Sequence, residues 1–419
     1  MGNNKNYFEI KCNALKSIGI SDRDISIMEE TINAEFSRGN KKVTISDSNK
    51  DESNGNVVNY IKIPIKNANE YLTLFSHPNK GSLHQQVIKS MQRTNNFNEL
   101  EFIESHSVHS KLLHYMYVDN NDKTTEDFLN RHYFPRTINA FAARNVNVPD
   151  GATLTISGTE DQEPVLVVLD ELTIGDDASI EWETAGTLIT EKTIYPEVEA
   201  GGNFNNDGGH GGEGGAASPA QNGKDGQEGK NGESILGICS RDPGTGSHGS
   251  DGSNGGNGGK GGNGGDALPV TWHSKEITGV IRVSANGGNG GLGSMGADGG
   301  NGGNGGRSGN NPGTCAPVFG GNGGNGGNGG IGGDGGAGGA GGNLNITFDI
   351  GIPRIDSSSN GGNAGKAGQA GGGGVAGQGG TGRPTGDNGK QGSPGSPGAG
   401  GVGGHAGAVN INGEVIQSI

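Results

Sequence analysis

Hydrophobic and polar positions change their pattern twice along the chain. In residues 1 to about 140, an apolar period consistent with a helix runs from Ile25 to Ile32, directly after Ser21, a residue type that commonly caps helices. A second helix is predicted from Leu83 to Met91, and residues 56–65 alternate as a strand does. This part is therefore predicted to be a mixed, mostly helical α+β head.

Residues 146–194 consist of short alternating apolar runs separated by turn residues. The runs are Val146/Val148, Leu154/Ile156, Val165/Val167/Leu169, Leu172/Ile174 and Ile180/Trp182. Short strands at this spacing are typical of a small solenoid or sandwich. We therefore expect a small all-β collar between the head and the rest of the chain.

Beyond residue 200 the dominant pattern is glycine at a regular spacing of three residues. Of 89 glycines, only nine lie in the first 200 residues. Residues 320–343 are eight uninterrupted Gly-Gly-X triplets, and 364–381 and 386–407 also keep glycine at every third position. Random low complexity would not hold this phase, so the region is neither a flexible linker nor unstructured.

A longer repeat is superimposed on the triplets. Three short strand-like segments enter glycine runs, at 197–199, 282–284 and 354–356, and three leave them, at 268–270, 344–346 and 409–411. The phase breaks midway through each run, at 233–247, 308–319 and 382–385. Each unit is therefore predicted to be a hairpin with a tip loop, which gives six glycine segments.

Glycine at every third position suits a helix with three residues per turn and no internal hydrogen bonds, because neighbouring helices can then approach and bond to one another. A collagen triple helix would need abundant proline, and the chain has 15 prolines, with almost none inside the Gly-Gly-Asn runs. The expected fold is therefore multidomain: an α+β head (1–140), an all-β collar (141–199) and a C-terminal polyglycine-II helix bundle (200–419).

Charge and composition exclude several classes of partner. The net charge is −15 and the sequence pI about 5.1, which disfavours binding to nucleic acid. We expect no membrane insertion, because no segment is long and apolar enough to span a bilayer, and the first residues show no secretion signal.

The three tip loops are the best candidate site, because their chemistry differs from that of the triplets. The candidate receptor-binding residues are Ile235, Leu236, Ile238, Arg241, Asp242, Pro317, Val318, Phe319 and Arg383. Cys239 and Cys315 lie in the first two loops and could form a disulfide if the tips meet. The alternative is that the apolar residues only cap the bundle and the thiols remain free.

Other motifs carry less chemistry. Residues 261–269 match one copy of a calcium-binding nonapeptide, but such sites need tandem copies. His106, His109 and His114 suggest a metal site. On a helix, His106 and His109 could share a face, but no third ligand is evident, so an ordinary polar surface is the simpler interpretation. No nucleophile, base and orienting group can be assembled, so we expect no enzymatic activity, no metal and no cofactor.

The runs at 287–291, 302–306 and 320–343, interrupted by variable loops, resemble the polyglycine-II bundles of phage tail-fibre tip adhesins and the repeats of springtail antifreeze proteins. The first resemblance implies a rigid stalk whose loops contact a cell-surface protein or glycan receptor, attached to a larger fibre or particle through its N-terminal part. The expected function is a non-enzymatic adhesin, extracellular or virion-associated. The alternatives are a structural or coat protein assembling through Gly-Gly-Asn faces, an ice-binding protein, and a toxin with its activity in residues 1–140.

Overall fold

The computed structural model describes residues 6–47, 56–78, 112, 115, 122–158, 164–197 and 202–416. Its helices lie in the N-terminal third: α1 (Tyr7–Ser17), α2 (Asp22–Ser37), α3 (Ala68–Phe75) and α7 (Lys123–His132). Helix α2 begins where the sequence predicts, since the Ser21 hydroxyl accepts from the Asp24 N–H and the Asp24 carboxylate accepts from the Ser21 N–H. The helix predicted at Leu83–Met91 lies outside the described residues.

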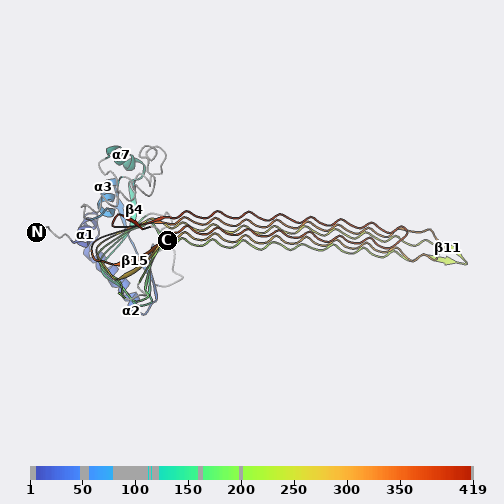
Figure 1. Ribbon diagram of the computed structural model, residues 1–419, viewed down its shortest axis with the longest axis horizontal. Coiled ribbons are helices and arrows are strands. Elements are labelled where there is room, and N and C mark those ends of the chain that lie inside the picture. Colours follow the sequence, from blue (N-terminus) through green and yellow to red (C-terminus); the bar gives the residue numbers. More distant parts are fainter. Residues whose placement is uncertain are drawn as a thin grey trace.

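Two large, mostly parallel sheets form the body of the molecule (Figure 1). One has seven strands, in the order β15 (Arg354–Ser358), β13 (Val280–Ser284), β9 (Gly202–Asn205), β7 (Ser179–Trp182), β5 (Thr153–Ile156), β1 (Lys42–Ser46) and β2 (Val57–Asn59). The other has eight, in the order β17 (Glu414–Ile416), β16 (Ala408–Ile411), β14 (Asn343–Ile350), β12 (Val270–Thr278), β8 (Gly186–Ile194), β6 (Val165–Ile174), β4 (Arg136–Val148) and β3 (Ile61–Ile65).

From β4 to β16, leaving aside two short strands within residues 233–241, the chain alternates between the two sheets, so each strand pairs in parallel with the next strand of its own sheet along the sequence. The sheets pack face to face around aromatic side chains. The ring of Phe204 stacks on Trp182 at 6.0 Å in its own sheet and on Trp272 at 5.4 Å in the opposite sheet. All three side chains are buried and belong to one hydrophobic core that the two sheets share.

The fold class expected from the sequence is wrong. The structure is an α/β protein with two large, mostly parallel sheets, not a separate α+β head, small collar and polyglycine-II bundle. The same two sheets contain strands from all three expected parts of the chain. They include β1 to β4 from the expected head, β5 to β8 from the expected collar, and β12 to β16, which lie between or after the glycine runs. The sequence pattern does not predict this because the pairing residues are far apart along the chain: Lys42 of β1 lies opposite Thr153 of β5, and Gly186 of β8 lies opposite Val270 of β12.

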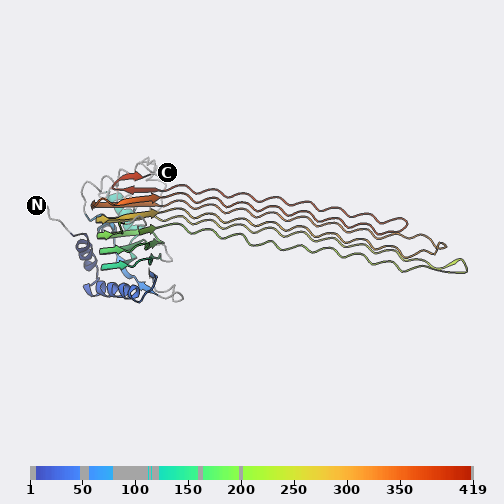
Figure 2. The same cartoon turned by 60° about the horizontal axis from the view of Figure 1, so that its bottom comes forward.

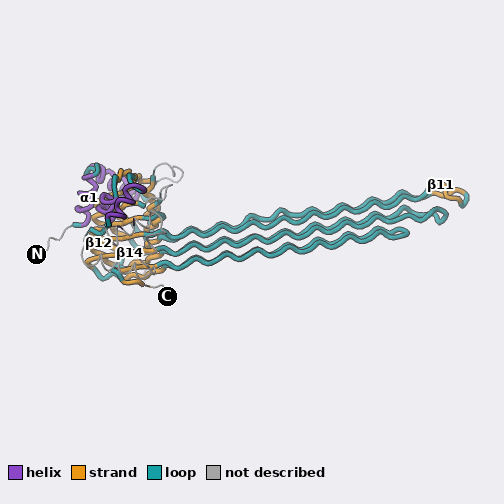
Figure 3. The backbone as a smooth tube through the Cα atoms, turned by 90° about the horizontal axis from the view of Figure 1, so that it is seen from above, coloured by secondary structure: helices purple, strands orange, loops and turns teal. Residues whose placement is uncertain are grey.

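The glycine runs are three hairpins inserted at equivalent connections between the sheets (Figure 2). Hairpin 1 (206–269) joins β9 to β12, hairpin 2 (286–342) joins β13 to β14, and hairpin 3 (359–407) joins β15 to β16. Each leaves the seven-stranded sheet as an outgoing segment and enters the eight-stranded sheet as a returning segment. All three extend from the same side of the body, side by side (Figures 2 and 3).

The hairpins keep the register of the strands that carry them. In the outgoing layer, hairpins 1 and 2 are offset by 79 residues, and so are β9 and β13, where Asn203 lies opposite Arg282. In the returning layer, hairpins 2 and 3 are offset by 65 residues, and so are β14 and β16, where Asn345 lies opposite Asn410. The glycine segments therefore continue the stacking of the two sheets, which is why they do not form an independent unit.

Hydrogen bonds at every third residue hold the segments together. Within the outgoing layer the Gly208 N–H donates to Asn286 O at 2.8 Å, and between the layers the Gly265 N–H donates to Gly209 O at 2.7 Å. The same two patterns repeat along the hairpins. Each such bond contributes only about 0.5–1.5 kcal/mol, so the arrangement depends on their cooperative repetition.

Asparagine at the third triplet position adds a further ladder of hydrogen bonds. The Asn325 N–H donates to Asp251 Oδ1 at 2.6 Å, and Asn325 Oδ1 in turn accepts from the Lys390 N–H at 2.8 Å. His210 and His248 serve the same role through Nδ1. Asn, Asp and His recur at X because each has an acceptor atom, Oδ1 or Nδ1, that reaches the backbone N–H of the neighbouring segment.

The number of glycines per triplet follows the position of the segment. In hairpin 2, which has neighbours on both sides, a Cβ on Gly323 or Gly324 would lie 2.1 Å from a carbonyl oxygen. In the returning segment of hairpin 3, at the edge, a Cβ on Gly395 would lie 2.0 Å from a carbonyl oxygen, whereas Gly400 has no atom within 4 Å. The collagen-like triplets of residues 386–397 are therefore edge triplets that need one glycine each.

Candidate binding site at the tips of the hairpins

The three tip loops lie at the end of the hairpins far from the sheets, and they are stepped rather than level. The tip of hairpin 1, which carries β10 (Glu233–Ile235) and β11 (Ile238–Arg241), extends furthest, and the tips of hairpins 2 and 3 recede in turn (Figures 1 and 3). The sequence hypothesis required parallel hairpins with their tips at one end. The steps arise because each hairpin is shorter than the one before it.

The outermost element is a two-stranded β-hairpin that presents aliphatic side chains. Strands β10 and β11 are antiparallel and are joined by Leu236 and Gly237, both of which have positive φ, 49° and 78°. This is the backbone of a tight two-residue turn, at which Asn or Gly is preferred over Leu. Leu236 is 97% exposed, and Ile235 and Ile238 on either side are 64% and 73% exposed.

An ion pair links the two short strands β10 and β11. The Arg241 guanidinium donates to the Glu233 carboxylate across the two strands and to Asn231 O at 3.3 Å. Both charged side chains are more than half exposed, so the ion pair orients the strands more than it stabilises the fold. Arg241 is among the candidate residues predicted from the sequence, whereas Glu233 is not. The alternation from Glu233 to Arg241 around a Leu-Gly turn was the available signal.

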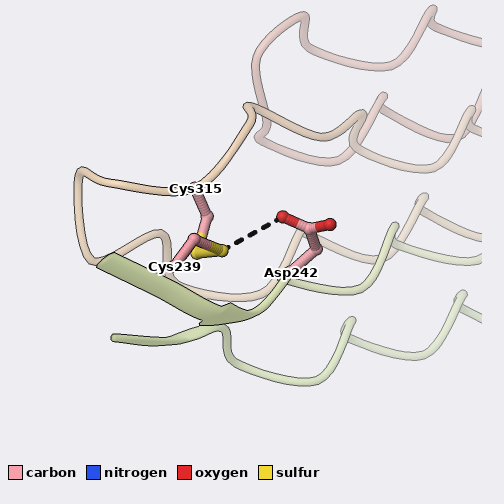
Figure 4. Close-up of side chains that lie close together, drawn as sticks. All are labelled: Cys239, Asp242 and Cys315. Carbon is pink, nitrogen blue, oxygen red and sulfur yellow. Dashed lines mark hydrogen bonds between the residues drawn. A yellow bond between two sulfur atoms is a disulfide. The ribbon is translucent and has the colours of Figure 1, made fainter. Parts of the chain in front are cut away.

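A disulfide joins the first tip to the second (Figure 4). Cys239 and Cys315 are bonded at an S–S distance of 2.04 Å with their Cα atoms 4.9 Å apart. Asp242, also drawn in Figure 4, places Oδ1 3.2 Å from Cys239 Sγ. Among the described residues these three form the single group of possible metal ligands, but both sulfurs are in the disulfide and offer no thiolate to a metal.

The second and third tips are tied to each other by backbone hydrogen bonds. The Arg383 N–H donates to Val318 O at 2.9 Å, and the Gly320 N–H donates to Pro384 O at 3.1 Å. Within the second tip, the Asn311 side chain donates to Cys315 O at 2.9 Å and so fixes the loop that carries the disulfide. Asn311 was not recognised from sequence, where it is one more asparagine among many.

The remaining candidate residues lie around these steps. Phe319 is 60% exposed, but its backbone O accepts from the Gly246 N–H, so it lies beside the returning segment of hairpin 1 and below the outermost turn. Pro317 and Arg383 are exposed, and Val318 is half-buried. The structure therefore brings Ile235, Leu236 and Ile238 together on one element and leaves Phe319 on a lower step.

The other candidate motifs do not form sites in the described part of the chain. Asp266, in the nonapeptide at 261–269, accepts a hydrogen bond from the Ala340 N–H and belongs to the ladder between segments. His106, His109 and His114 lie outside the described residues. No described helix is both long and apolar enough to cross a membrane.

Comparison with known proteins gives no match: no family model, no curated protein and no solved structure is similar to this chain. The resemblance to phage adhesins and antifreeze repeats therefore stays a prediction.

Proposed function

We propose that this protein is a non-enzymatic, adhesin-like binding protein that contacts a receptor on a cell surface through the tip of hairpin 1. The observation that carries the proposal is the fully exposed Leu236 at the most distal turn, flanked by exposed Ile235 and Ile238. Adjacent exposed aliphatic side chains are costly in water and commonly mark a surface that binds a partner.

The backbone at Leu236 supports a binding role over simple capping. A capping residue would cover the ends of glycine segments and be buried against them, whereas Leu236 is 97% exposed. Its positive φ is unfavourable for a branched side chain, and such outliers persist where another requirement outweighs the local cost. Glycine or asparagine would form the same turn more readily, so the leucine side chain itself is the feature that needs a function.

The rest of the tip supports a site that is preorganised for binding. The Cys239–Cys315 disulfide and the Arg241–Glu233 pair hold the outermost hairpin before a partner arrives, which lowers the entropy lost on binding. Disulfides persist in oxidising surroundings, so an extracellular or virion-associated location fits this tip.

The opposite end of the molecule offers a second exposed apolar point. Ile350 and Ile352, at the connection between β14 and β15, are 50% and 100% exposed and lie on the side of the sheets away from the hairpins. A larger fibre or particle would attach there, at the body, and leave the hairpins free to project. The receptor itself is a cell-surface protein or a glycan.

The test replaces Leu236 by glycine. Leu236→Gly suits the positive φ and keeps the turn, so the hairpin should retain its disulfide and its thermal stability while losing the apolar side chain. Met295→Ala is the matched control, because Met295 is 61% exposed on the side of hairpin 2 and not at a tip.

Fluorescently labelled full-length protein would be titrated onto a panel of bacterial and animal cells and onto a glycan array. Saturable binding to at least one surface is expected for the wild type and for Met295→Ala, with a clear loss for Leu236→Gly. Equal binding by Leu236→Gly, or no saturable binding to any surface of the panel, contradicts the proposal.

A further inference from the structure

The hairpins are unusually rich in Asn-Gly dipeptides, which carry a specific chemical liability. The backbone nitrogen of the glycine can lose its proton and attack the asparagine side-chain carbonyl carbon, which expels ammonia and forms a succinimide. Water then opens the ring to aspartate or isoaspartate. The reaction requires a glycine N–H that is accessible to base and an asparagine side chain that can turn back onto it.

Nearly all of these dipeptides are blocked by the hydrogen bonds that build the hairpins. The Gly287 N–H, after Asn286, donates to Asn360 O at 2.8 Å, and the Gly290 N–H, after Asn289, donates to Asn363 O at 2.8 Å. The asparagine side chains are also occupied, since Asn289 Oδ1 accepts from the Asn363 N–H at 2.8 Å. The other glycines after asparagine that donate in this way are Gly223, Gly232, Gly255, Gly258, Gly264, Gly302, Gly305, Gly323, Gly326, Gly329 and Gly389.

Asn360-Gly361 is different because it lies in the outgoing segment of hairpin 3, at the edge of the outgoing layer. Each outgoing segment donates these N–H groups to the next hairpin, and hairpin 3 is followed by none. Within the described part of the chain, the Gly361 N–H has no hydrogen-bond partner, and the Asn360 side chain is exposed. The equivalent Gly287, in hairpin 2, is buried and bonded.

Both segments of hairpin 3 lie at an edge, and in each triplet one backbone N–H faces no further hairpin. In the other triplets of the two segments, this N–H does not belong to a glycine that follows asparagine. In the outgoing segment, the residues at these positions are Ala364, Ala367, Ala370, Gly373 and Ala376. Only Ala364 follows an asparagine, and alanine in place of glycine makes the ring closure slower. Along the returning edge the corresponding positions hold Asn388, Gln391, Pro394, Pro397, Gly400, Gly403 and Ala406, and none of them follows asparagine.

We propose that Asn360 is a site of spontaneous deamidation, at which hairpin 3 is chemically modified while the other hairpins remain intact. Formation of isoaspartate inserts one carbon into the backbone two residues before Gly362, whose N–H donates to Gly339 O at 2.8 Å. The three-residue period of hairpin 3 then no longer matches hairpin 2 at this point. The modification loosens hairpin 3 next to β15 and adds a negative charge there.

The test follows the modification by mass spectrometry in folded full-length protein held at mildly alkaline pH. Trypsin cleavage after Arg354 and Lys366 releases residues 355–366 with Asn360, and cleavage after Arg282 and Arg307 releases residues 283–307 with four Asn-Gly dipeptides. Conversion of an amide to an acid is expected in the first peptide, at Asn360. It should be slower in the second by at least roughly tenfold, which corresponds to about 1.4 kcal/mol of local opening.

Two controls separate structure from intrinsic reactivity. In denatured protein the difference between the peptides should vanish, because no glycine N–H is then bonded. Asn360→Gln, which keeps an exposed amide but forms the cyclic product far more slowly, should remove the modification from the first peptide in folded protein. Equal rates in the two folded peptides, or no change at Asn360 while the denatured chain reacts, overturn the proposal.

Discussion

Asn325 and Lys390 lie in neighbouring returning segments, 65 residues apart in the sequence, and Asn325 Oδ1 accepts a hydrogen bond of 2.8 Å from the Lys390 backbone N–H. The bond places an asparagine side chain where a strand in a sheet would place a backbone carbonyl. It therefore satisfies a backbone donor that glycine or alanine at position 325 would leave to water.

Removal of this acceptor should weaken the attachment of hairpin 3 to hairpin 2. Asn325→Ala leaves the Lys390 N–H without its partner and is expected to cost about 0.5–1.5 kcal/mol. Asn325→Asp would keep an acceptor oxygen but would place a second carboxylate beside Asp251, whose Oδ2 lies 3.4 Å from Asn325 Nδ2. The comparison is therefore made at Asn328, which accepts from the Ser393 N–H and lies beside the neutral Asn254, and there Asn328→Asp should cost less than Asn328→Ala. Amide hydrogen exchange of hairpin 3 measures the difference, and equal protection in both variants would argue against the ladder.

The crowded glycines should tolerate no side chain, and the open ones should. A Cβ on Gly211 would lie 2.0 Å from Gly262 O, whereas a Cβ on the adjacent Gly212 meets nothing within 4 Å. Gly211→Ala should force the two segments of hairpin 1 apart and speed hydrogen exchange around it. Gly212→Ala should be neutral or stabilise the protein by up to about 1 kcal/mol, because alanine loses less backbone entropy. Similar effects of the two substitutions would contradict the close packing.

The sequence predicted local features of this molecule well. The apolar runs from Val146 to Trp182 are strands, and the segments at 282–284 and 354–356 lie in β13 and β15. Glycine phase located the three hairpins, because a Cβ at the wrong position would collide with a neighbouring carbonyl. These features depend on the residue itself and its near neighbours.

The assembly of those features into two sheets could not be predicted in the same way. Val270 lies opposite Gly186 and Leu344, and nothing near Val270 in the sequence specifies either partner. The offsets of 79, 74 and 65 residues are set by hairpin lengths, which the triplet period alone does not connect to strand pairing. At the tip, the sequence identifies the aliphatic turn as a candidate, but it does not decide whether Cys239 and Cys315 pair, because that depends on how far each hairpin extends.

Cys12 should be inert to alkylation in the folded protein. The thiol is buried in α1, and burial raises its pKa to about 12, although Lys16 and Arg144 act in the opposite direction. Because the thiolate is the reactive form, iodoacetamide at pH 8 should leave Cys12 unmodified until the protein unfolds. After reduction of the disulfide, Cys239 should react in the same sample and so serve as the control. Labelling of Cys12 at the rate of Cys239 would be incompatible with its burial.

Asp242 should protect the tip disulfide from reduction. Its Oδ1 lies 3.2 Å from Cys239 Sγ, where its negative charge repels an approaching thiolate and opposes the charge on the thiolate that leaves. Removal of a charge at this distance from an exposed site changes the barrier by about 1 kcal/mol, or roughly fivefold in rate. Asp242→Asn is therefore expected to be reduced faster by dithiothreitol at neutral pH, followed by the appearance of free thiols.

Asp251→Asn is the matched control for this measurement, because it removes the same charge from the returning segment of hairpin 1 and keeps an acceptor for the Asn325 N–H. Its disulfide should be reduced at the wild-type rate at moderate ionic strength, where charges separated by more than about 10 Å are screened. If Asp242→Asn and Asp251→Asn accelerate reduction equally, the effect comes from net charge and the contact at Cys239 has no protective role.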